Sequence, residues 1–208
     1  MGIGKIMKKW QSDLLRDIRF NDSRDDSDLP LSETTDVYYD GQNGEFTPCN
    51  HESLKKYFLT VKDRCRAILE IGIARSEFGS SYTLVKNKNK DCVYIGVDIR
   101  DCSFLNDEEN NVYTLQTKSE NYSEILEFIK SKGVEEIDFI FIDGWHSINQ
   151  VYAEWEFTNL LSEYGIVGFH DTNNHPGPKL FVQNLNFDWV VQKECLTDHG
   201  ISFVWKKQ

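Results

Sequence analysis

Basic residues are scarce in this sequence relative to acidic ones. It has 23 Lys and Arg residues against 34 Asp and Glu residues, which gives a net charge of −11. Nucleic acids and anionic membrane surfaces bind proteins that carry a surplus of positive charge. The composition therefore argues against nucleic acid and against a membrane as partners.

Long hydrophobic runs are also missing. No apolar stretch approaches the ~18 residues that cross a bilayer, and no signal-peptide core is visible. A chain of 208 residues that is 39% hydrophobic and 27% charged suits one globular fold with a sizeable core. We expect a cytoplasmic protein.

The cysteines lack any regular spacing. There are five of them, and no two form a CxxC pair. A disulfide framework or a zinc cluster needs paired cysteines, so the sequence predicts neither. Free thiols are expected at all five positions, which are Cys49, Cys65, Cys92, Cys102 and Cys195.

The first 60 residues predict a helical and acidic extension. Apolar spacing indicates an amphipathic helix over residues 3–19, which favours packing or self-association into a homo-oligomer. Residues 21–36 are acidic and poor in apolar side chains, as in a connector or a lid over a site. Thr47-Pro48 then offers the start of a helix that continues through Leu59. We expect this extension to cover the side of the site that receives a substrate.

Residues 61–208 alternate between apolar strands and helices. The strands are continuously apolar, as in a parallel sheet that helices cover on both faces. Asp198-His199-Gly200 predicts a hairpin turn, so the last strand should run antiparallel. The fold class is therefore α/β, a doubly wound and mostly parallel seven-stranded sheet. Strands are expected at 65–73, 92–98, 111–117, 137–143, 165–171, 189–195 and 201–206, and helices from Gly79, at 122–132, from Ile148 to about Ser162, and at 178–185.

Two features at the ends of the first two strands predict a ligand site. Ligands of open parallel sheets bind beyond the carboxyl ends of the strands. In "EIGIARSEFGSS" (70–81), Gly72 permits a sharp turn, although Ala74 stands where a dinucleotide fingerprint has its second glycine. Taken alone, this stretch fits a plain strand–helix turn about as well as it fits a ligand-binding loop. Asp98 ends the second strand, where a carboxylate can accept both hydroxyls of a ribose, and the pair favours an adenosine-containing ligand.

Acidic and imidazole groups follow the next two strands. Asp143 and Asp171 end neighbouring strands, so their like charges should be close and need a counter-ion or a proton. Oxygen ligands of this kind suit Mg²⁺. His146 follows Asp143 closely and is a natural general base. A lone Asp there is usually a helix cap and a lone His is usually solvated, but Asp98, Asp143, His146, His170 and Asp171 all fall at one edge.

With these motifs the chain resembles the class I S-adenosylmethionine-dependent methyltransferases over roughly residues 64–208. Glu70-Ile71-Gly72 is similar to their first motif, and Asp98 to their ribose-binding acid. The resemblance implies S-adenosylmethionine as cofactor. The residues that it places in the cofactor site are Glu70, Gly72, Ala74, Gly79, Ser80, Asp98, Gln116, Ser119 and Asp143.

"IDGWHS" and "GIVGFHDTNNHPG" resemble more specifically the small-molecule branch, with macrolide-sugar O-methyltransferases and cephalosporin-hydroxylase-like proteins. This resemblance implies O-methylation of a small-molecule acceptor, such as a sugar, with His146 as base. It also implies Mg²⁺ held by Asp143, Asp171 and the neighbouring His170. His170 stands where the branch has a second acid, and an imidazole there favours Mn²⁺ or Zn²⁺ over Mg²⁺.

Two other functions remain open from the sequence. His170 in place of an acid is compatible with a catalytically silent module that keeps the fold and binds the cofactor or assembles through its N-terminal helix. A nicotinamide-dependent oxidoreductase on the same topology is disfavoured because the glycine fingerprint is broken.

Overall fold

The computed structural model describes residues 46–73, 79–173 and 175–207. The helix expected at 3–19 and the acidic connector at 21–36 lie outside these residues, as does Ala74. The helices are α3 (Pro48–Val61), α4 (Ser80–Asn87), α5 (Tyr122–Ser131), α6 (Ile148–Trp155) and α7 (Pro176–Gln183), with short 3-10 turns η2 (Ser103–Leu105), η3 (Glu108–Asn110) and η4 (Glu156–Leu160). The strands are β1 (Ala67–Ile71), β2 (Val93–Asp98), β3 (Val112–Gln116), β4 (Ile137–Ile142), β5 (Leu161–His170), β6 (Trp189–Glu194) and β7 (Ile201–Lys206).

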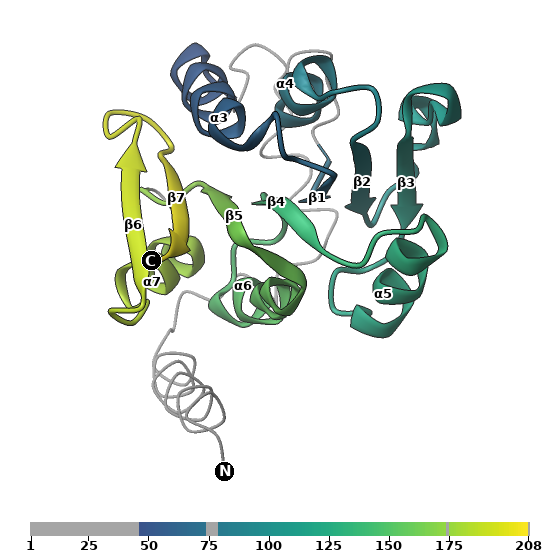
Figure 1. Cartoon of the computed structure of the whole chain (residues 1–208). Coiled ribbons are helices and arrows are strands. Elements are labelled where there is room, and N and C mark those ends of the chain that lie inside the picture. The colour runs from purple at the N-terminus through teal and green to yellow at the C-terminus, as the bar shows by residue number, and fades with distance from the viewer. Residues whose placement is uncertain (1–45, 74–78, 174, 208) are drawn as a thin grey trace.

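The strands form one seven-stranded sheet in the order β3-β2-β1-β4-β5-β7-β6. The first five are parallel, and β7 runs antiparallel to both β5 and β6. Figure 1 shows α3 and α4 on one face of the sheet and α5, α6 and α7 on the other. The predicted fold class is confirmed, including the antiparallel last strand that follows the turn at Gly200.

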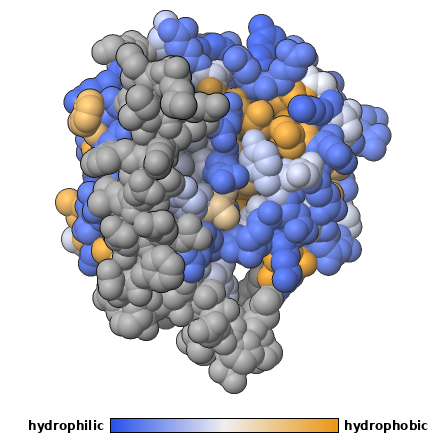
Figure 2. Space-filling view, turned by 90° about the horizontal axis from the view of Figure 1, so that it is seen from below, coloured by the Kyte–Doolittle hydropathy of each residue, from blue (hydrophilic) through white to orange (hydrophobic). Residues whose placement is uncertain are grey.

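Helices on both faces explain why the central strands carry apolar side chains without alternation. Every residue of β1 is buried, and β4 is buried at all but one position. One core lies under α5, α6 and α7, and a second lies under α3 and α4. The face in Figure 2 shows apolar patches between hydrophilic side chains.

The helix α3 is packed into this fold. Its residues Leu54, Phe58 and Val61 are at most 1% exposed. Thr47 is its N-cap residue, and the Thr47 hydroxyl accepts from the backbone N–H of Asn50, as the Thr-Pro start predicts. Within the described residues, no helix has the length and apolar character of a membrane span.

The expected boundary between the fourth helix and the fifth strand was wrong. The helix ends at Trp155 instead of about Ser162, and β5 already begins at Leu161 instead of residue 165. Leu161 pairs with Ile137, and the register then shifts at a bulge. Ser162 donates to the carboxylate of Asp138 at 2.7 Å, which holds the early part of the strand against β4. No Gly or Pro marks this change in the sequence.

The expectation of five free thiols was also wrong. Cys49 and Cys195 form a disulfide, while Cys65, Cys92 and Cys102 are buried thiols outside any disulfide. The packing of α3 against β5 and β7 brings the start of α3 next to the end of β6. The two cysteines are separated by 146 residues, so no local spacing could show the pair. The cysteines therefore give no ground for a reducing compartment, and the cytoplasmic location stays a prediction.

Candidate active site

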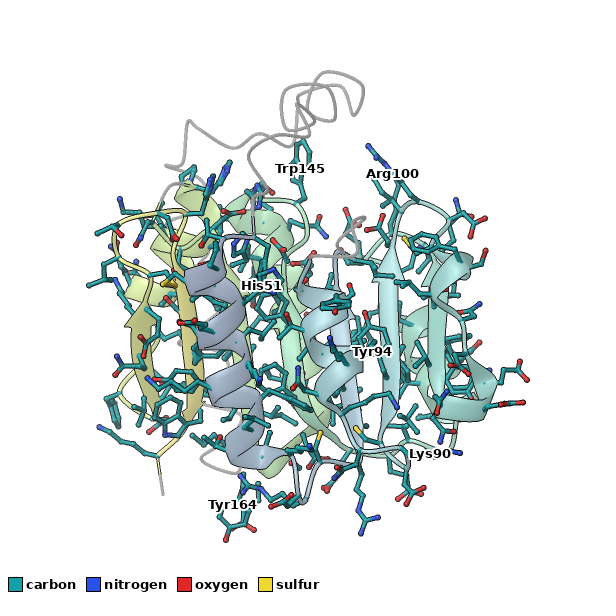
Figure 3. All side chains as sticks on the ribbon, turned by 90° about the horizontal axis from the view of Figure 1, so that it is seen from above. His51, Lys90, Tyr94, Arg100, Trp145 and Tyr164 are labelled. Carbon is teal, nitrogen blue, oxygen red and sulfur yellow. A yellow bond between two sulfur atoms is a disulfide. The ribbon has the colours of Figure 1, made fainter. Side chains whose placement is uncertain are left out.

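The carboxyl ends of β1, β2, β4 and β5 meet at one edge of the sheet. Gly72, Asp98, Asp143 and Asp171 each follow or end one of these strands. In Figure 3, Trp145 and Arg100 lie at this end of the molecule, and Tyr164 and Lys90 lie at the opposite end. The edge predicted to bind a ligand is thus the one where the polar residues of the sequence motifs gather.

The turn after β1 requires a glycine. Gly72 has φ +82°, and a Cβ on it would lie 2.0 Å from the carbonyl oxygen of Asp143. The Gly72 amide donates to Val97 at 2.9 Å, and the Asp143 amide donates to Ile71 at 2.8 Å. These bonds extend the sheet by one residue and bring the backbones after β1 and β4 into contact.

Asp98 connects the segments that follow β1 and β2. Its two carboxylate oxygens accept the backbone N–H of Ile73 at 2.9 Å and of Arg100 at 2.8 Å. Its exposure is 8%. A carboxylate accepts hydrogen bonds only and has about four lone-pair sites, which is the chemistry that ribose hydroxyls need from a partner.

Glu70 and Ser80 are fully buried and bond to each other, and the Tyr94 hydroxyl also donates to Glu70. Burial raises the pKa of Glu70 to about 7, although the hydrogen bonds from Ser80 and Tyr94 oppose this. These side chains fix the start of α4 beneath the glycine turn. Gly79 is the N-cap residue of α4, so it also lies at this turn.

The two residues expected near an adenine have different surroundings. Gln116 is exposed, and its amide donates to the carbonyl of Ile99 at 3.2 Å. Ser119 donates to the buried carboxyl of Glu154 at 2.7 Å and accepts from Gln150. Burial raises the pKa of Glu154 to about 8, against the effect of these hydrogen bonds. Ser119 is therefore anchored to α6, whereas Gln116 is open to solvent.

Four of the five histidines of the chain gather around Asp171. Its Oδ2 lies 2.7 Å from Nε2 of His146 and 3.3 Å from Nδ1 of His170. Its Oδ1 lies 3.2 Å from Nδ1 of His199. The ring of His175 stacks on that of His146 with centroids 3.9 Å apart. Asp171 has φ +59°, a left-handed conformation that costs a non-glycine residue free energy and often occurs at functional sites.

His170 lies between the two carboxylates that were expected to hold a metal. Its Nδ1 is 3.0 Å from Asp143 and 3.3 Å from Asp171, and its Nε2 is 2.9 Å from the amide of Asn50. Burial alone would lower the pKa of His170, but Asp143 and Asp171 hold it well above 6.5. A protonated His170 donates from both ring nitrogens, so it needs the side-chain oxygen of Asn50 rather than its nitrogen at Nε2. With Asn50 in that orientation, His170 can supply the counter-charge that the two acids need, without a metal ion.

The electrostatics of His146 and Asp171 favour a charged pair. Burial opposes ionisation of both, yet His170 and His146 hold the pKa of Asp171 well below its usual value. Burial also lowers the pKa of His146, but Asp171 and Asp143 raise it, and the net shift is upward. Burial and the neighbouring His146 lower the pKa of His175 to about 4. His146 can thus accept a proton that the charge of Asp171 then stabilises.

Three predicted metal ligands do lie together. One ligand atom each of Asp143, His170 and Asp171 falls within 4.8 Å of the other two. Two carboxylates and an imidazole can hold a divalent ion. Two carboxylates are a usual protein contribution to Mg²⁺, whereas the imidazole suits Mn²⁺ better. The metal site stays a prediction.

Sequence reasoning missed three residues of this cluster, which are His175, His199 and Asn50. His175 lies at the end of the motif "GIVGFHDTNNHPG" without an assigned role, and His199 was considered only as part of a hairpin turn. Asn50 carried no signal, because α3 brings it to His170 from 120 residues away.

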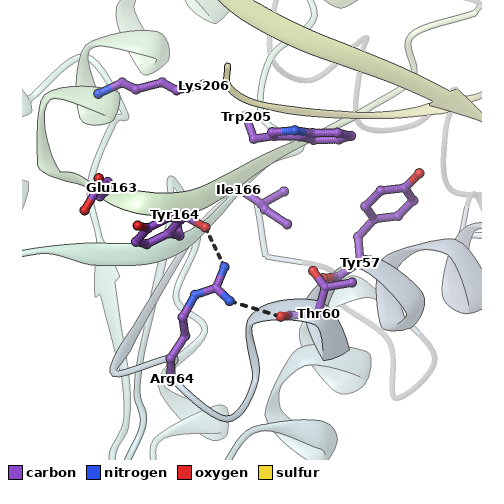
Figure 4. Close-up of a pocket in the computed structure, with 8 residues that line it drawn as sticks. All are labelled: Tyr57, Thr60, Arg64, Glu163, Tyr164, Ile166, Trp205 and Lys206. Atoms are coloured by element: carbon purple, nitrogen blue, oxygen red, sulfur yellow. Dashed lines mark hydrogen bonds between the residues drawn. The ribbon is translucent and has the colours of Figure 1, made fainter. Parts of the chain in front are cut away.

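A hollow of about 240 Å³ lies away from this cluster, at the opposite end of the sheet. Figure 4 shows Arg64 in its wall, donating to the carbonyl oxygens of Thr60 and Tyr164. Its lining contains none of the residues that the sequence motifs singled out.

No family model matches the sequence, and no curated protein matches it. Several solved structures match the fold of the chain. MycE methyltransferase from the mycinamycin biosynthetic pathway, in complex with Mg, SAH and mycinamycin VI, has 18% identity and a TM-score of 0.58 over 86% of this chain and 54% of its own. The O-methyltransferase from Bacillus cereus in complex with SAH has 18% identity and a TM-score of 0.58, over 88% of this chain and 94% of its own. The chain spans about half the length of MycE, and it has the fold that these methyltransferases share.

Proposed function

We propose that the chain is an S-adenosylmethionine-dependent O-methyltransferase that acts on a hydroxyl of a small molecule. The observation that carries the proposal is the placement of Asp98 and the His146–Asp171 pair at one edge of the sheet. Asp98 offers a carboxylate to ribose hydroxyls. His146, which contacts Asp171 at 2.7 Å, offers an imidazole base to an acceptor hydroxyl.

The cofactor would lie across the ends of β1, β2 and β4. The amino-acid part of the cofactor would bind at the turn of Gly72 and at the start of α4, with Gly79 and Ser80. Ala74 is proposed for the same part, and Glu70 would support the turn from the core. Asp98 would accept the ribose hydroxyls, Gln116 and Ser119 would lie near the adenine, and Asp143 would border the sulfonium. When bound, S-adenosylmethionine supplies an electrophilic methyl group.

His146 would take the proton from the acceptor hydroxyl. Nε2 lies 2.7 Å from Asp171, and in the tautomer that carries its proton on Nε2 the lone pair of the neutral ring is on Nδ1. Asp171 would orient the ring and stabilise the imidazolium that forms. General base catalysis of this kind contributes about 10²–10⁴-fold to a rate.

Asp143, His170 and Asp171 would hold Mg²⁺ or Mn²⁺ if the transfer is metal-assisted. Such an ion makes a bound hydroxyl more acidic. Support comes from the closeness of the three ligand atoms. A chelator separates the two cases. Transfer that is lost in EDTA and returns with Mn²⁺ or Mg²⁺ supports the ion, and full transfer in EDTA by wild type and Asp143→Asn contradicts it.

The acceptor proposed here is a sugar or another polyol. Support comes from the motif resemblance and from the fold shared with MycE, whose structure holds mycinamycin VI. The N-terminal extension, with Trp10, Tyr38 and Tyr39, would line the acceptor side.

Label transfer tests the proposed function. The chain is incubated with methyl-labelled S-adenosylmethionine and a panel of free sugars, glycosylated macrolides and simple phenols. We expect label in a hydroxyl-bearing acceptor and about 10²–10⁴-fold slower labelling with His146→Ala. Binding of the cofactor without transfer to any acceptor class would contradict the enzyme proposal and favour the silent module.

A further inference from the structure

The His175-Pro176-Gly177 segment brings a second imidazole against His146. The two rings stack at 3.9 Å with an interplanar angle of 24°. A Cβ on Gly177 would lie 2.0 Å from the carbonyl oxygen of His146, so the first turn of α7 can rest on this backbone only because residue 177 has no side chain. The proposed methyl transfer gives this segment no role.

Asp171 is held in the same place by its backbone. The N–H of His175 donates to the carbonyl of Asp171 at 3.1 Å, and the left-handed φ of Asp171 directs the chain into this turn. One ligand atom each of His146, Asp171 and His175 lies within 4.8 Å of the other two. Close backbone contacts thus fix three metal-ligating side chains next to each other before any ion binds.

We propose that His146, Asp171 and His175 form a binding site for a divalent transition metal such as Zn²⁺ or Co²⁺. Two imidazoles and one carboxylate are a donor set that suits these ions and leaves coordination positions open for water. Their bonds to nitrogen and oxygen are about 2.0–2.2 Å long, so small side-chain rotations would close the three atoms around an ion. Mg²⁺ prefers oxygen ligands and should bind here poorly.

Neighbouring groups support Asp171 as a ligand. His199 contacts its Oδ1 at 3.2 Å, and His170 contacts its Oδ2 at 3.3 Å. Outer contacts of this kind orient ligating carboxylates and affect metal affinity. The site shares only Asp171 with the cluster of Asp143, His170 and Asp171, so the two sites can be told apart by substitution.

Metal binding at this site would compete with base catalysis. An imidazole whose lone pair binds an ion cannot accept a proton at the same time. Zn²⁺ should therefore slow any transfer that uses His146. The site itself is measured without an acceptor or a cofactor, so its test does not depend on the proposed function.

The full chain, freed of metal with EDTA and then dialysed, is titrated with Zn²⁺ by calorimetry and with Co²⁺ by its visible absorption. We expect wild type to bind one ion of each per chain with a large excess of Mg²⁺ present. His175→Gln should lower both affinities by at least about tenfold and change the Co²⁺ bands, because even the loss of an outer partner of a metal ligand typically costs about 10–100-fold. His51→Gln is the matched control, because His51 is the one histidine outside the cluster.

Two further variants make the test decisive. Asp143→Asn should leave the Co²⁺ bands unchanged, because Asp143 belongs only to the other cluster. Gly177→Ala should weaken binding by displacing α7, and circular dichroism with urea unfolding shows whether each variant is folded. Wild-type affinity in folded His175→Gln, or loss of binding in Asp143→Asn alone, would overturn the proposal. SAH binding measured on the same samples reports separately on the proposed function.

Discussion

The carbonyl oxygen of Asp143 occupies the space that a side chain on Gly72 would need, since a Cβ there would lie 2.0 Å from it. The turn after β1 and the loop after β4 are therefore in backbone contact. This contact places Asp143 beside the glycine turn and positions the loop that leads to His146.

Gly72→Ala should destabilise the protein more than Gly133→Ala does. Both residues have positive φ, which costs an L-residue about 1–2 kcal/mol, but a Cβ on Gly133 meets nothing within 4 Å. At Gly72 the backbone must also move, and overpacking adds about 1–3 kcal/mol. Urea unfolding measures the difference in unfolding free energy. Equal losses of unfolding free energy in the two variants would show that the backbone at Gly72 adjusts to the new side chain without destabilising the protein.

The pH dependence of turnover should depend on the His146–Asp171 pair. His146→Ala should lower turnover by about 10²–10⁴-fold and leave SAH affinity nearly unchanged. Activity needs the neutral imidazole, so the rate rises with pH through the pKa of His146. Burial lowers this pKa and Asp171 raises it, so Asp171→Asn should move the rising part of the pH–rate profile to lower pH. An unchanged pH–rate profile in Asp171→Asn would show that Asp171 does not act on the base.

The contribution of His170 to stability should decline at high pH. Burial lowers its pKa, but Asp143 and Asp171 hold it well above the unfolded value of about 6.5. The imidazolium contribution is then fully present below about pH 6.5 and is lost as the pH rises through the folded pKa. The difference in unfolding free energy between wild type and His170→Gln should therefore narrow with rising pH. A difference that widens would mean that His170 is neutral in the folded protein.

The disulfide should stabilise the fold measurably. Cys49 and Cys195 are separated by 146 residues, and loss of a native disulfide typically costs about 2–5 kcal/mol. A reductant should lower the unfolding free energy of wild type and leave that of Cys49→Ser unchanged, since the remaining thiols are free. Equal urea curves for wild type with and without reductant would show that the bond does not stabilise the protein.

The sheet was predictable because short stretches of sequence are enough to identify its strands and turns. Apolar runs marked the strands, and Asp198-His199-Gly200 marked the turn before β7. The start of β5 was missed because Leu161 and Ser162 join the sheet through partners on β4, next to a bulge. The residues around Leu161 carry no local sequence signal of this pairing.

The positions of the clustered side chains were predictable where the residues end strands and unpredictable where loops bring them together. Asp98, Asp143 and Asp171 follow from the strand pattern. The stack of His175 on His146 depends on the close approach at Gly177, and the contact of His199 depends on how the hairpin folds back. His170 was expected as a metal ligand, whereas its position between two acids also makes it their counter-charge.

Binding of SAH by wild type and by Asp98→Ala, measured by calorimetry, tests the central claim most directly. Asp98 is the charged acceptor expected for the ribose, and hydrogen bonds to charged groups contribute about 1.5–3 kcal/mol. Asp91→Asn is the control, because it removes an exposed carboxylate just before β2, away from the site. We predict that wild type and Asp91→Asn bind SAH alike and that Asp98→Ala binds about tenfold more weakly or worse. Unchanged SAH affinity in Asp98→Ala, or binding of NAD in place of SAH by wild type, would contradict the account.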